Sequence, residues 1–136
     1  MPIEDFAEFI AKEVKGKTVV EIGVGFQPKV ALKLRDMGYE VTVTDWNEAA
    51  VKNARVLGLN AVMDDVFSPR LEVYQKADAL YSVRPTPEMI PPLIRLGNVL
   101  RKTVFILPFS GDPVPPSTRL VNHNGLAIYV YKPPTK

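Results

Sequence analysis

The stretch VVEIGVGFQPKVA, from Val19 to Ala31, decides the fold of this chain, because an apolar run passes through an acid and two glycines into a helix start. β-Branched residues dominate Thr18–Ile22, which predicts a short strand. Pro28 suits the first turn of a helix, where its missing N–H is not needed. The junction is either a cofactor-binding loop or a tight turn, and the rest of the sequence bears on that choice.

Short apolar strands and amphipathic helices alternate along the remainder of the chain. Further strands are predicted over residues 39–44, 60–63, 79–83 and 103–107. Helices are predicted over residues 3–15 and 28–37, after a capping Asn47, as one or two turns in 71–76, and within 88–100. The apolar face of the second helix runs to Met37, and that of the third runs to Leu57. Pro91 and Pro92 are tolerated only in the first turn of the last helix.

The C-terminal part departs from this alternation. Residues 119–121 and 127–131 flank Asn124-Gly125, which is a strong hairpin signal. We therefore predict one α/β domain over residues 1–136, a doubly wound, mostly parallel Rossmann-like sheet with a C-terminal antiparallel hairpin. Residues 1–16 form its N-terminal helix, and residues 132–136 form a loose tail.

Composition excludes several classes of protein. The chain has 136 residues, 46% hydrophobic and 24% charged, as expected for a soluble globular domain. It has no apolar run long enough for a membrane helix and no secretory signal, so we expect a cytoplasmic protein without a membrane partner. The absence of cysteine excludes a disulfide framework, a thiolate metal site and a cysteine nucleophile. The net charge of +2 comes from scattered cations, which does not indicate nucleic-acid binding.

The glycine turn lies where open α/β sheets bind ligands, beyond the carboxyl end of the first strand. Gly23 and Gly25 let the backbone turn sharply and approach a ligand, and the following helix offers free N–H groups. Asp45 ends the second strand, twenty residues after Gly25. Its carboxylate can accept hydrogen bonds from two ribose hydroxyls, or it can cap the next helix.

Nicotinamide and methyl-donor cofactors share this geometry, and two residues separate them. The dinucleotide pattern G-x-G-x-x-G requires a glycine where this chain has Pro28. Glu21 stands where a dinucleotide-binding strand continues with apolar residues. An acid there suits a ligand with an ammonium group near the loop and no pyrophosphate to repel.

The segment from Val19 to Asn47 resembles the first two motifs of class I S-adenosylmethionine-dependent methyltransferases, and the resemblance extends over residues 17–112. Glu21, Gly23 and Gly25 match the acid-x-glycine-x-glycine core of the first motif. As a whole, the chain is most similar to a small family of archaeal proteins of unknown function. The resemblance implies S-adenosylmethionine as the cofactor.

The resemblance also implies further contacts to the adenosine part of that cofactor. Asp45 matches the ribose-binding acid, and Trp46 stands where a side chain often covers the adenine. The sequence MDDVFSP places either Asp64 or Asp65 where an aspartate commonly contacts the adenine amino group.

The acceptor side is less well defined. Ser82, Arg84 and Pro85 follow the fourth strand, where they would shape the acceptor site with the help of the loop 108–116. Arg84 would project into the cleft, where it could bind a phosphate or carboxylate, or else it is a surface arginine. The sequence SVRP replaces the Asn/Asp-Pro-Pro-aromatic motif of amino-methylating enzymes, so that chemistry is not supported.

Two classes of function remain open. The first is a methyltransferase with an unknown acceptor, and the second is a degenerate Rossmann-like module that acts through nucleoside or protein contacts. Gln27, at the position of the motif's third glycine, favours the second because its side chain could narrow the methionine pocket. An NAD-dependent oxidoreductase is disfavoured. We expect no metal site, and we expect the only histidine, His123, to be exposed in the hairpin turn.

Overall fold

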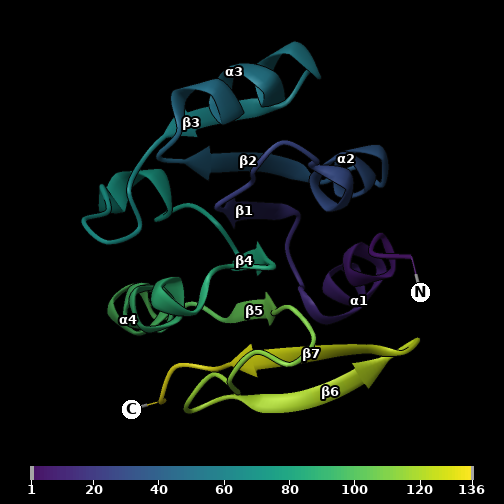
Figure 1. Cartoon of the computed structure of the whole chain (residues 1–136), viewed down its shortest axis with the longest axis vertical. Helices are drawn as coiled ribbons and strands as arrows, with labels where there is room; N and C mark the ends of the chain where they lie inside the picture. The colour runs from purple at the N-terminus through teal and green to yellow at the C-terminus, as the bar shows by residue number, and fades with distance from the viewer. Residues whose placement is uncertain (1, 136) are drawn as a thin grey trace.

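The computed structural model describes residues 2–135, which form a single sheet with helices on both faces (Figure 1). The strands are β1 (Thr18–Ile22), β2 (Glu40–Asp45), β3 (Asn60–Met63), β4 (Ala79–Val83), β5 (Val104–Leu107), β6 (Arg119–His123) and β7 (Leu126–Tyr131). The helices are α1 (Asp5–Glu13), α2 (Lys29–Asp36), α3 (Glu48–Val56) and α4 (Ile90–Leu100), with short 3₁₀ turns η1 (Leu71–Val73) and η2 (Pro87–Met89).

The sheet has the order β3-β2-β1-β4-β5-β7-β6. Strands β1 to β5 are parallel, whereas β7 is antiparallel to β5 and β6 is antiparallel to β7. This arrangement confirms the predicted doubly wound sheet with a C-terminal hairpin at one edge. The order reverses beside β1, so the ends of β1, β2 and β4 meet at the switch point where such sheets bind ligands.

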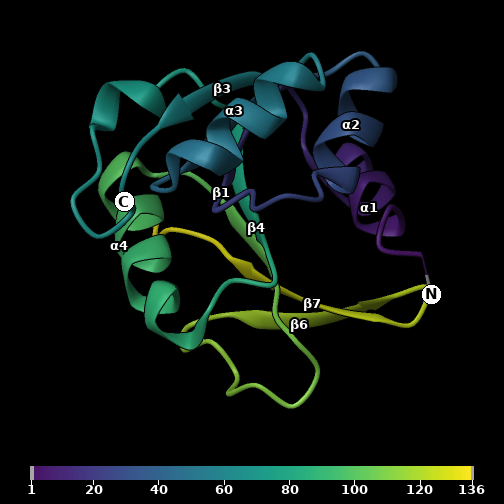
Figure 2. The same ribbon diagram turned by 45° about the horizontal axis from the view of Figure 1, so that its top comes forward.

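Each face of the sheet has its own apolar core, because successive residues of a strand point to opposite sides. Val19 belongs to the core that α1, α2 and α3 cover, and Val20 belongs to the core under α4 and the η1 turn. Figure 2 shows α1 and α2 on one side of the sheet and α4 on the other. Continuous apolar strands such as Val104–Leu107 are buried on both faces, as expected for the centre of a parallel sheet.

The local signals in the sequence are confirmed at most element ends. The Asn47 side chain caps α3 by accepting a hydrogen bond from the Ala49 N–H at 2.9 Å. Pro91 and Pro92 lie in the first turn of α4. Asn124 and Gly125 both have positive φ angles, of 50° and 84°, as the tight hairpin turn requires.

Some helices are shorter than predicted. The N-terminal helix, predicted over residues 1–16, spans Asp5–Glu13, and Met1 lies outside the described residues. Met37 and Leu57 take the C-cap positions of α2 and α3, where the helix has ended, and both are partly exposed. In the tail, residues 132–135 form no helix or strand, but the Pro134 carbonyl accepts a hydrogen bond from the Arg101 guanidinium at 3.2 Å. Lys136, the last residue of the predicted tail, lies outside the described residues. Within residues 2–135, no helix is long and apolar enough to cross a bilayer.

Candidate functional site

The glycine turn after β1 is held against the end of β2. The backbone N–H groups of Gly23 and Val24 both donate to the Thr44 carbonyl, at 2.9 and 3.0 Å. Gly23 has a φ of 74°, and a Cβ at this position would lie 2.8 Å from the Cε of Met89. Gly25 has a φ of 64° but open space around it. The left-handed backbone therefore calls for glycine at both positions, and a Cβ at Gly23 would in addition make the end of the Met89 side chain shift.

The Asp45 carboxylate joins the two loops that follow β1 and β2. Its Oδ2 accepts from the Gly25 N–H and its Oδ1 accepts from the Asn47 N–H, each at 2.9 Å. The cap of α3 is Asn47, so the alternative interpretation of Asp45 as a helix cap is wrong. Each carboxylate oxygen has a second lone pair, so Asp45 can still accept hydrogen bonds from a ligand.

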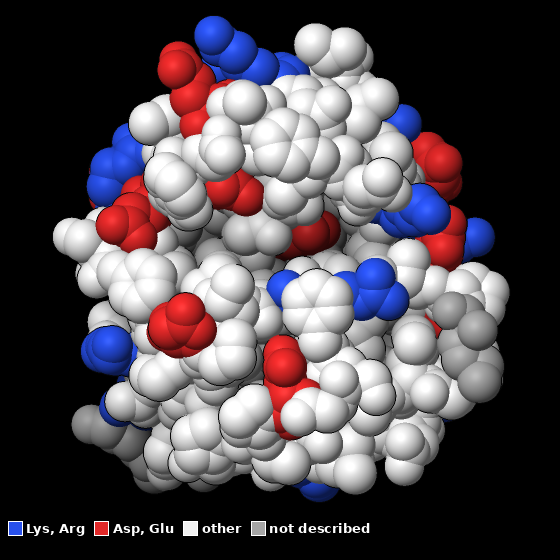
Figure 3. All heavy atoms as spheres, viewed as in Figure 1, with Lys and Arg blue, Asp and Glu red and all other residues white. Residues whose placement is uncertain are grey.

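Two cavities flank the glycine turn. Figure 3 shows a hollow across the middle of the molecule, with Asp and Glu side chains recessed in it and Lys and Arg side chains at its edge. The first of the two cavities, here named the β2–β3 cavity, has a volume of about 140 Å³. It is lined by Ile22, Gly23, Thr44, Asp45, Trp46, Asp64, Asp65, Val66, Phe67, Thr86 and Met89. The second, here named the Glu21 cavity, has a volume of about 310 Å³ and is lined by Ile3, Glu21, Val24, Gly25, Phe26, Gln27, Lys29, Val30, Val83, Arg84 and Phe109.

Glu21 is a buried acid, and one of its two carboxyl oxygens has no hydrogen-bond partner among the described residues. Its side chain is 1% exposed, and its Oε1 meets no donor among the described residues. The strand register places it opposite Tyr81 of β4, whose buried hydroxyl also has no partner there. Burial raises the pKa of Glu21 to about 8; the nearby Tyr81 hydroxyl lowers it, and the Asp45 carboxylate raises it further. The carboxyl is therefore mostly protonated at neutral pH, and a cation beside it would favour ionisation.

The two consecutive aspartates after β3 differ in their surroundings. Asp64 is buried and accepts from the backbone N–H and the Nε of Arg70, at 3.2 and 3.1 Å, and from the Tyr74 hydroxyl. Asp65 is exposed, and its Oδ1 accepts from the Phe67 N–H at 2.9 Å. Both line the β2–β3 cavity beside Trp46, but Asp64 is already committed to a network that holds the following loop. Asp65 is thus the aspartate whose carboxylate has room for an additional donor.

Ser82 was predicted to help shape the acceptor site, but its side chain has no access to a cavity. Ser82 is fully buried, and its Oγ donates to the Ile22 carbonyl at 2.7 Å, so it ties β4 to β1 beneath the cavities. Arg84 is exposed and lines the Glu21 cavity, and its binding of a phosphate or carboxylate stays a prediction. Its φ is 50°, and its guanidinium carbon lies 5.6 Å from the centre of the Phe109 ring.

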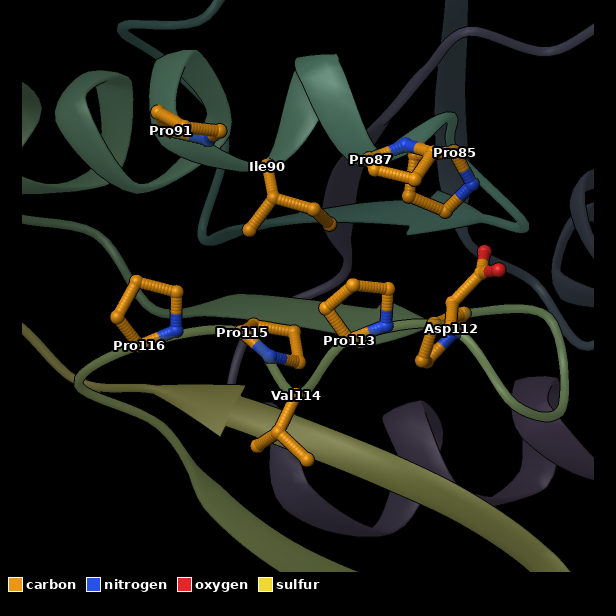
Figure 4. A pocket seen from close by; sticks show the side chains of 10 residues that line it. Pro85, Pro87, Ile90, Pro91, Asp112, Pro113, Val114, Pro115 and Pro116 are labelled. Carbon is orange, nitrogen blue, oxygen red and sulfur yellow. The ribbon is translucent and has the colours of Figure 1, made fainter.

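Pro85 lines a third cavity of about 220 Å³, here named the proline cavity. Figure 4 shows Pro85, Pro87 and Ile90 on one side of it, facing residues 112–116 of the loop after β5. The prolines of segment 85–91 and those of the loop 108–116, which the rest of α4 and strand β5 separate in the sequence, are thus brought together. Thr86 and Met89 of the same segment line the β2–β3 cavity, so the segment 85–90 is the wall between the two cavities.

The remaining predictions concern Gln27, His123 and a metal site. Gln27 is exposed at the edge of the Glu21 cavity and leaves its volume open. His123 is not exposed in the turn: β6 extends to this residue, whose ring packs 5.4 Å from the Phe9 ring with its Nε2 buried. No group of three or more potential metal-ligating side chains occurs within residues 2–135.

Three contacts at the site were not predicted. Tyr81 opposite Glu21, Met89 over Gly23, and Phe109 beside Arg84 each depend on segments distant in the sequence. Tyr81 lies in a mostly apolar strand, and nothing in the local sequence distinguishes it from the other buried residues of that strand. A signal was available only for Phe109, which stands among prolines in a loop already expected near the acceptor.

Comparison with known proteins places the chain in a family. Residues 3–133 match the family described as an uncharacterised protein family, UPF0146. A UPF0146 protein of Pyrococcus abyssi is 42% identical over 129 residues, which cover 95% of this chain and 98% of the relative.

Solved structures with a similar fold include methyltransferases. An RNA methyltransferase from Salinibacter ruber in complex with S-adenosyl-L-homocysteine gives a TM-score of 0.74 at 16% identity, covering 99% of this chain and 92% of that one. A TehB-like SAM-dependent methyltransferase from Corynebacterium glutamicum gives a TM-score of 0.70 at 16% identity, covering 96% and 89%. At these identities the likeness establishes a methyltransferase-like fold.

Proposed function

This chain belongs to the uncharacterised protein family UPF0146, and we propose that it binds S-adenosylmethionine and transfers its methyl group to an unknown acceptor. The adenosine would lie in the β2–β3 cavity and the amino-acid end in the Glu21 cavity. Gly23 lines the first and Gly25 lines the second, so a ligand that spans both cavities crosses the glycine turn.

Glu21 is the observation that carries this proposal. A carboxyl that is 1% exposed, and whose Oε1 has no hydrogen-bond donor among the described residues, destabilises the fold because its loss of solvation is not fully compensated. An ammonium group in the cavity supplies both the missing donors and the opposite charge. A nicotinamide dinucleotide would instead bring its anionic pyrophosphate close to the carboxyl groups of Glu21 and Asp45.

The residues of the β2–β3 cavity fit an adenosine. Asp45 lies at the end of β2 with lone pairs available for two ribose hydroxyls. Trp46 is 73% exposed beside it, which leaves an indole face to cover a planar base. Asp65 provides a carboxylate for an exocyclic amino group. Because Asp45 also fixes the Gly25 N–H, the ribose contact and the glycine turn are positioned together.

S-Adenosylmethionine, when bound, supplies an electrophilic methyl group on a sulfonium. The residues of this chain would then orient the ligand and hold it against an acceptor, and positioning of this kind is worth roughly 7–11 kcal/mol. Pro85 and the wall segment 85–90 lie between the β2–β3 cavity and the proline cavity. The acceptor would approach from this side, at the end of β4.

A second function, nucleoside binding without turnover, is supported by Met89. Its terminal methyl group lies over Gly23, on the path between the two cavities. If the side chain stays there, the two cavities remain separate and only the adenosine part of a ligand is held. A flexible methionine can also move aside, which is the arrangement that the first proposal requires.

Calorimetric titration tests both functions. We expect S-adenosylmethionine and S-adenosylhomocysteine to bind the wild-type protein and NAD not to bind. Glu21→Gln, which keeps the shape and removes the ionisable group, should weaken binding of the first two. Binding of adenosine as tightly as S-adenosylhomocysteine would favour the non-enzymatic function, and preferential binding of NAD would overturn both.

A further inference from the structure

Two groups that can carry opposite charges line the Glu21 cavity at different depths. Glu21 is buried within it, whereas Arg84 is exposed. The ion pairs among residues 2–135 are Arg35–Asp36, Lys52–Glu48 and Arg70–Asp64, so Arg84 is not neutralised by an acid of the described chain. A guanidinium without a carboxylate partner beside a ligand cavity is available for an anion.

The backbone of Arg84 is fixed in an unusual conformation. Its φ of 50° is in the left-handed region, which is uncommon for residues other than glycine, and such strain concentrates at functional sites. The Arg84 N–H donates to the Leu107 carbonyl of β5 at 2.6 Å, which holds the turn at the end of β4. The Phe109 ring then packs against the guanidinium. These two contacts therefore hold the Arg84 side chain near the cavity instead of leaving it free to extend into solvent.

We propose that Arg84 binds the α-carboxylate of the ligand while Glu21 binds its α-ammonium, so that the cavity selects nucleosides carrying a complete α-amino acid. This inference rests on the proposed function. The two ligand groups are attached to one carbon atom, so their partners must reach the same small space, and Glu21 and Arg84 line the same cavity. The planar guanidinium also matches a carboxylate in a bidentate geometry.

Lys29 is the competing cation, since it also lines the Glu21 cavity. It lies in the first turn of α2 and is exposed, with an ammonium at the end of a flexible chain. Among the described residues, no aromatic ring packs against the Lys29 ammonium in the way that the Phe109 ring packs against the Arg84 guanidinium. Lys29→Gln is therefore the matched control for a test of Arg84.

The experiment compares two ligands that differ only in the carboxylate. S-Adenosylhomocysteine and its decarboxylated analogue, 5′-deoxy-5′-(3-aminopropylthio)adenosine, are titrated calorimetrically into wild type, R84N, R84K and K29Q. Asparagine tolerates positive φ, so R84N should keep the melting temperature of the wild type. R84K keeps the positive charge but lacks the planar guanidinium. It tests the same contact if R84N proves less stable than the wild type.

We expect wild type to prefer S-adenosylhomocysteine to the decarboxylated analogue by roughly 10–100-fold. R84N should lose this preference by binding S-adenosylhomocysteine more weakly while binding the analogue unchanged. R84K should keep part of the preference, and K29Q should keep it all.

Four results would overturn the inference. Equal weakening of both ligands by R84N means that Arg84 acts on the shape of the site, and loss of the preference in K29Q alone assigns the carboxylate to Lys29. Equal affinity of wild type for both ligands overturns the carboxylate contact but leaves the proposed function standing. If wild type binds neither compound, the proposed function fails and this inference fails with it.

Discussion

Glu21 and Tyr81 face each other across β1 and β4, and the buried oxygen atoms Oε1 and Oη of this pair have no hydrogen-bond partner among the described residues. Burial raises the pKa of both groups, that of Glu21 to about 8. An acid in this state lowers the stability of the empty protein at neutral pH. In the proposed function, the ammonium group of the ligand lies beside Glu21 and supplies hydrogen-bond donors to it.

The first prediction concerns stability and pH. In the unfolded chain Glu21 ionises near its ordinary pKa of 4.5, and in the folded protein near 8, so unfolding releases a proton between these values. The free energy of unfolding should therefore fall as pH rises from 4.5 to 8, by up to about 5 kcal/mol at about 1.4 kcal/mol per unit.

Urea denaturation of wild type and Glu21→Gln across this pH range measures the effect. The Gln variant should lack this fall and be the more stable protein at pH 8. Glu40→Gln, which changes an exposed acid of β2, is the control and should follow the wild-type profile. A wild-type profile as flat as that of Glu21→Gln would contradict the raised pKa.

The second prediction concerns protons released on ligand binding. At pH 7 Glu21 is mostly protonated in the empty cavity, and an α-ammonium beside it should favour the carboxylate. Binding of S-adenosylhomocysteine should then release close to one proton. Calorimetry in two buffers of different ionisation enthalpy measures this number, and Glu21→Gln should release none. Proton uptake by the wild type would show that the ammonium does not lie at Glu21.

The third prediction concerns Asp45. Replacement by alanine removes the acceptor for the Gly25 and Asn47 N–H groups as well as the proposed ribose contact. We expect the unfolding free energy to fall by about 1–3 kcal/mol and the affinity for S-adenosylhomocysteine to fall roughly 10–100-fold. Asn47→Ala, which removes only the cap of α3, should lower stability by about 1 kcal/mol without changing affinity. If Asp45→Ala binds S-adenosylhomocysteine as tightly as the wild type does, Asp45 has only a structural role.

The fourth prediction concerns Gln27. Its exposed side chain lies at the edge of the Glu21 cavity, and the cavity is open beside it. Gln27→Gly should therefore change the affinity for S-adenosylmethionine little and lower the unfolding free energy by only about 0.5–1 kcal/mol. Titration calorimetry and thermal unfolding measure the two effects. A large gain in affinity would mean that Gln27 obstructs the site, and nucleoside binding without turnover would become the better proposal.

The sequence by itself determined the elements and their order. Thr18–Ile22 and Ala79–Val83 were predicted as strands, because burial on both faces of the sheet leaves a mostly apolar local pattern. The edge strand Asn60–Met63 was also predicted. The glycine turn and the Asn124-Gly125 hairpin were also predictable, since positive φ angles restrict the choice of residue at the turn itself. These features depend on residues close together in the chain.

Only the tertiary structure decided what each candidate side chain does. The register of β1 against β4 places Glu21 opposite Tyr81, and the register does not follow from either strand alone. Asp64 and Asp65 have identical side chains in the sequence, yet Arg70 and Tyr74 engage the first and leave the second exposed. Ser82 is buried against Ile22, and Arg84, two residues later, lies beside Phe109 at the Glu21 cavity. Burial, hydrogen-bond partners and pKa values arise from contacts between distant segments, and local patterns of residue type do not encode them.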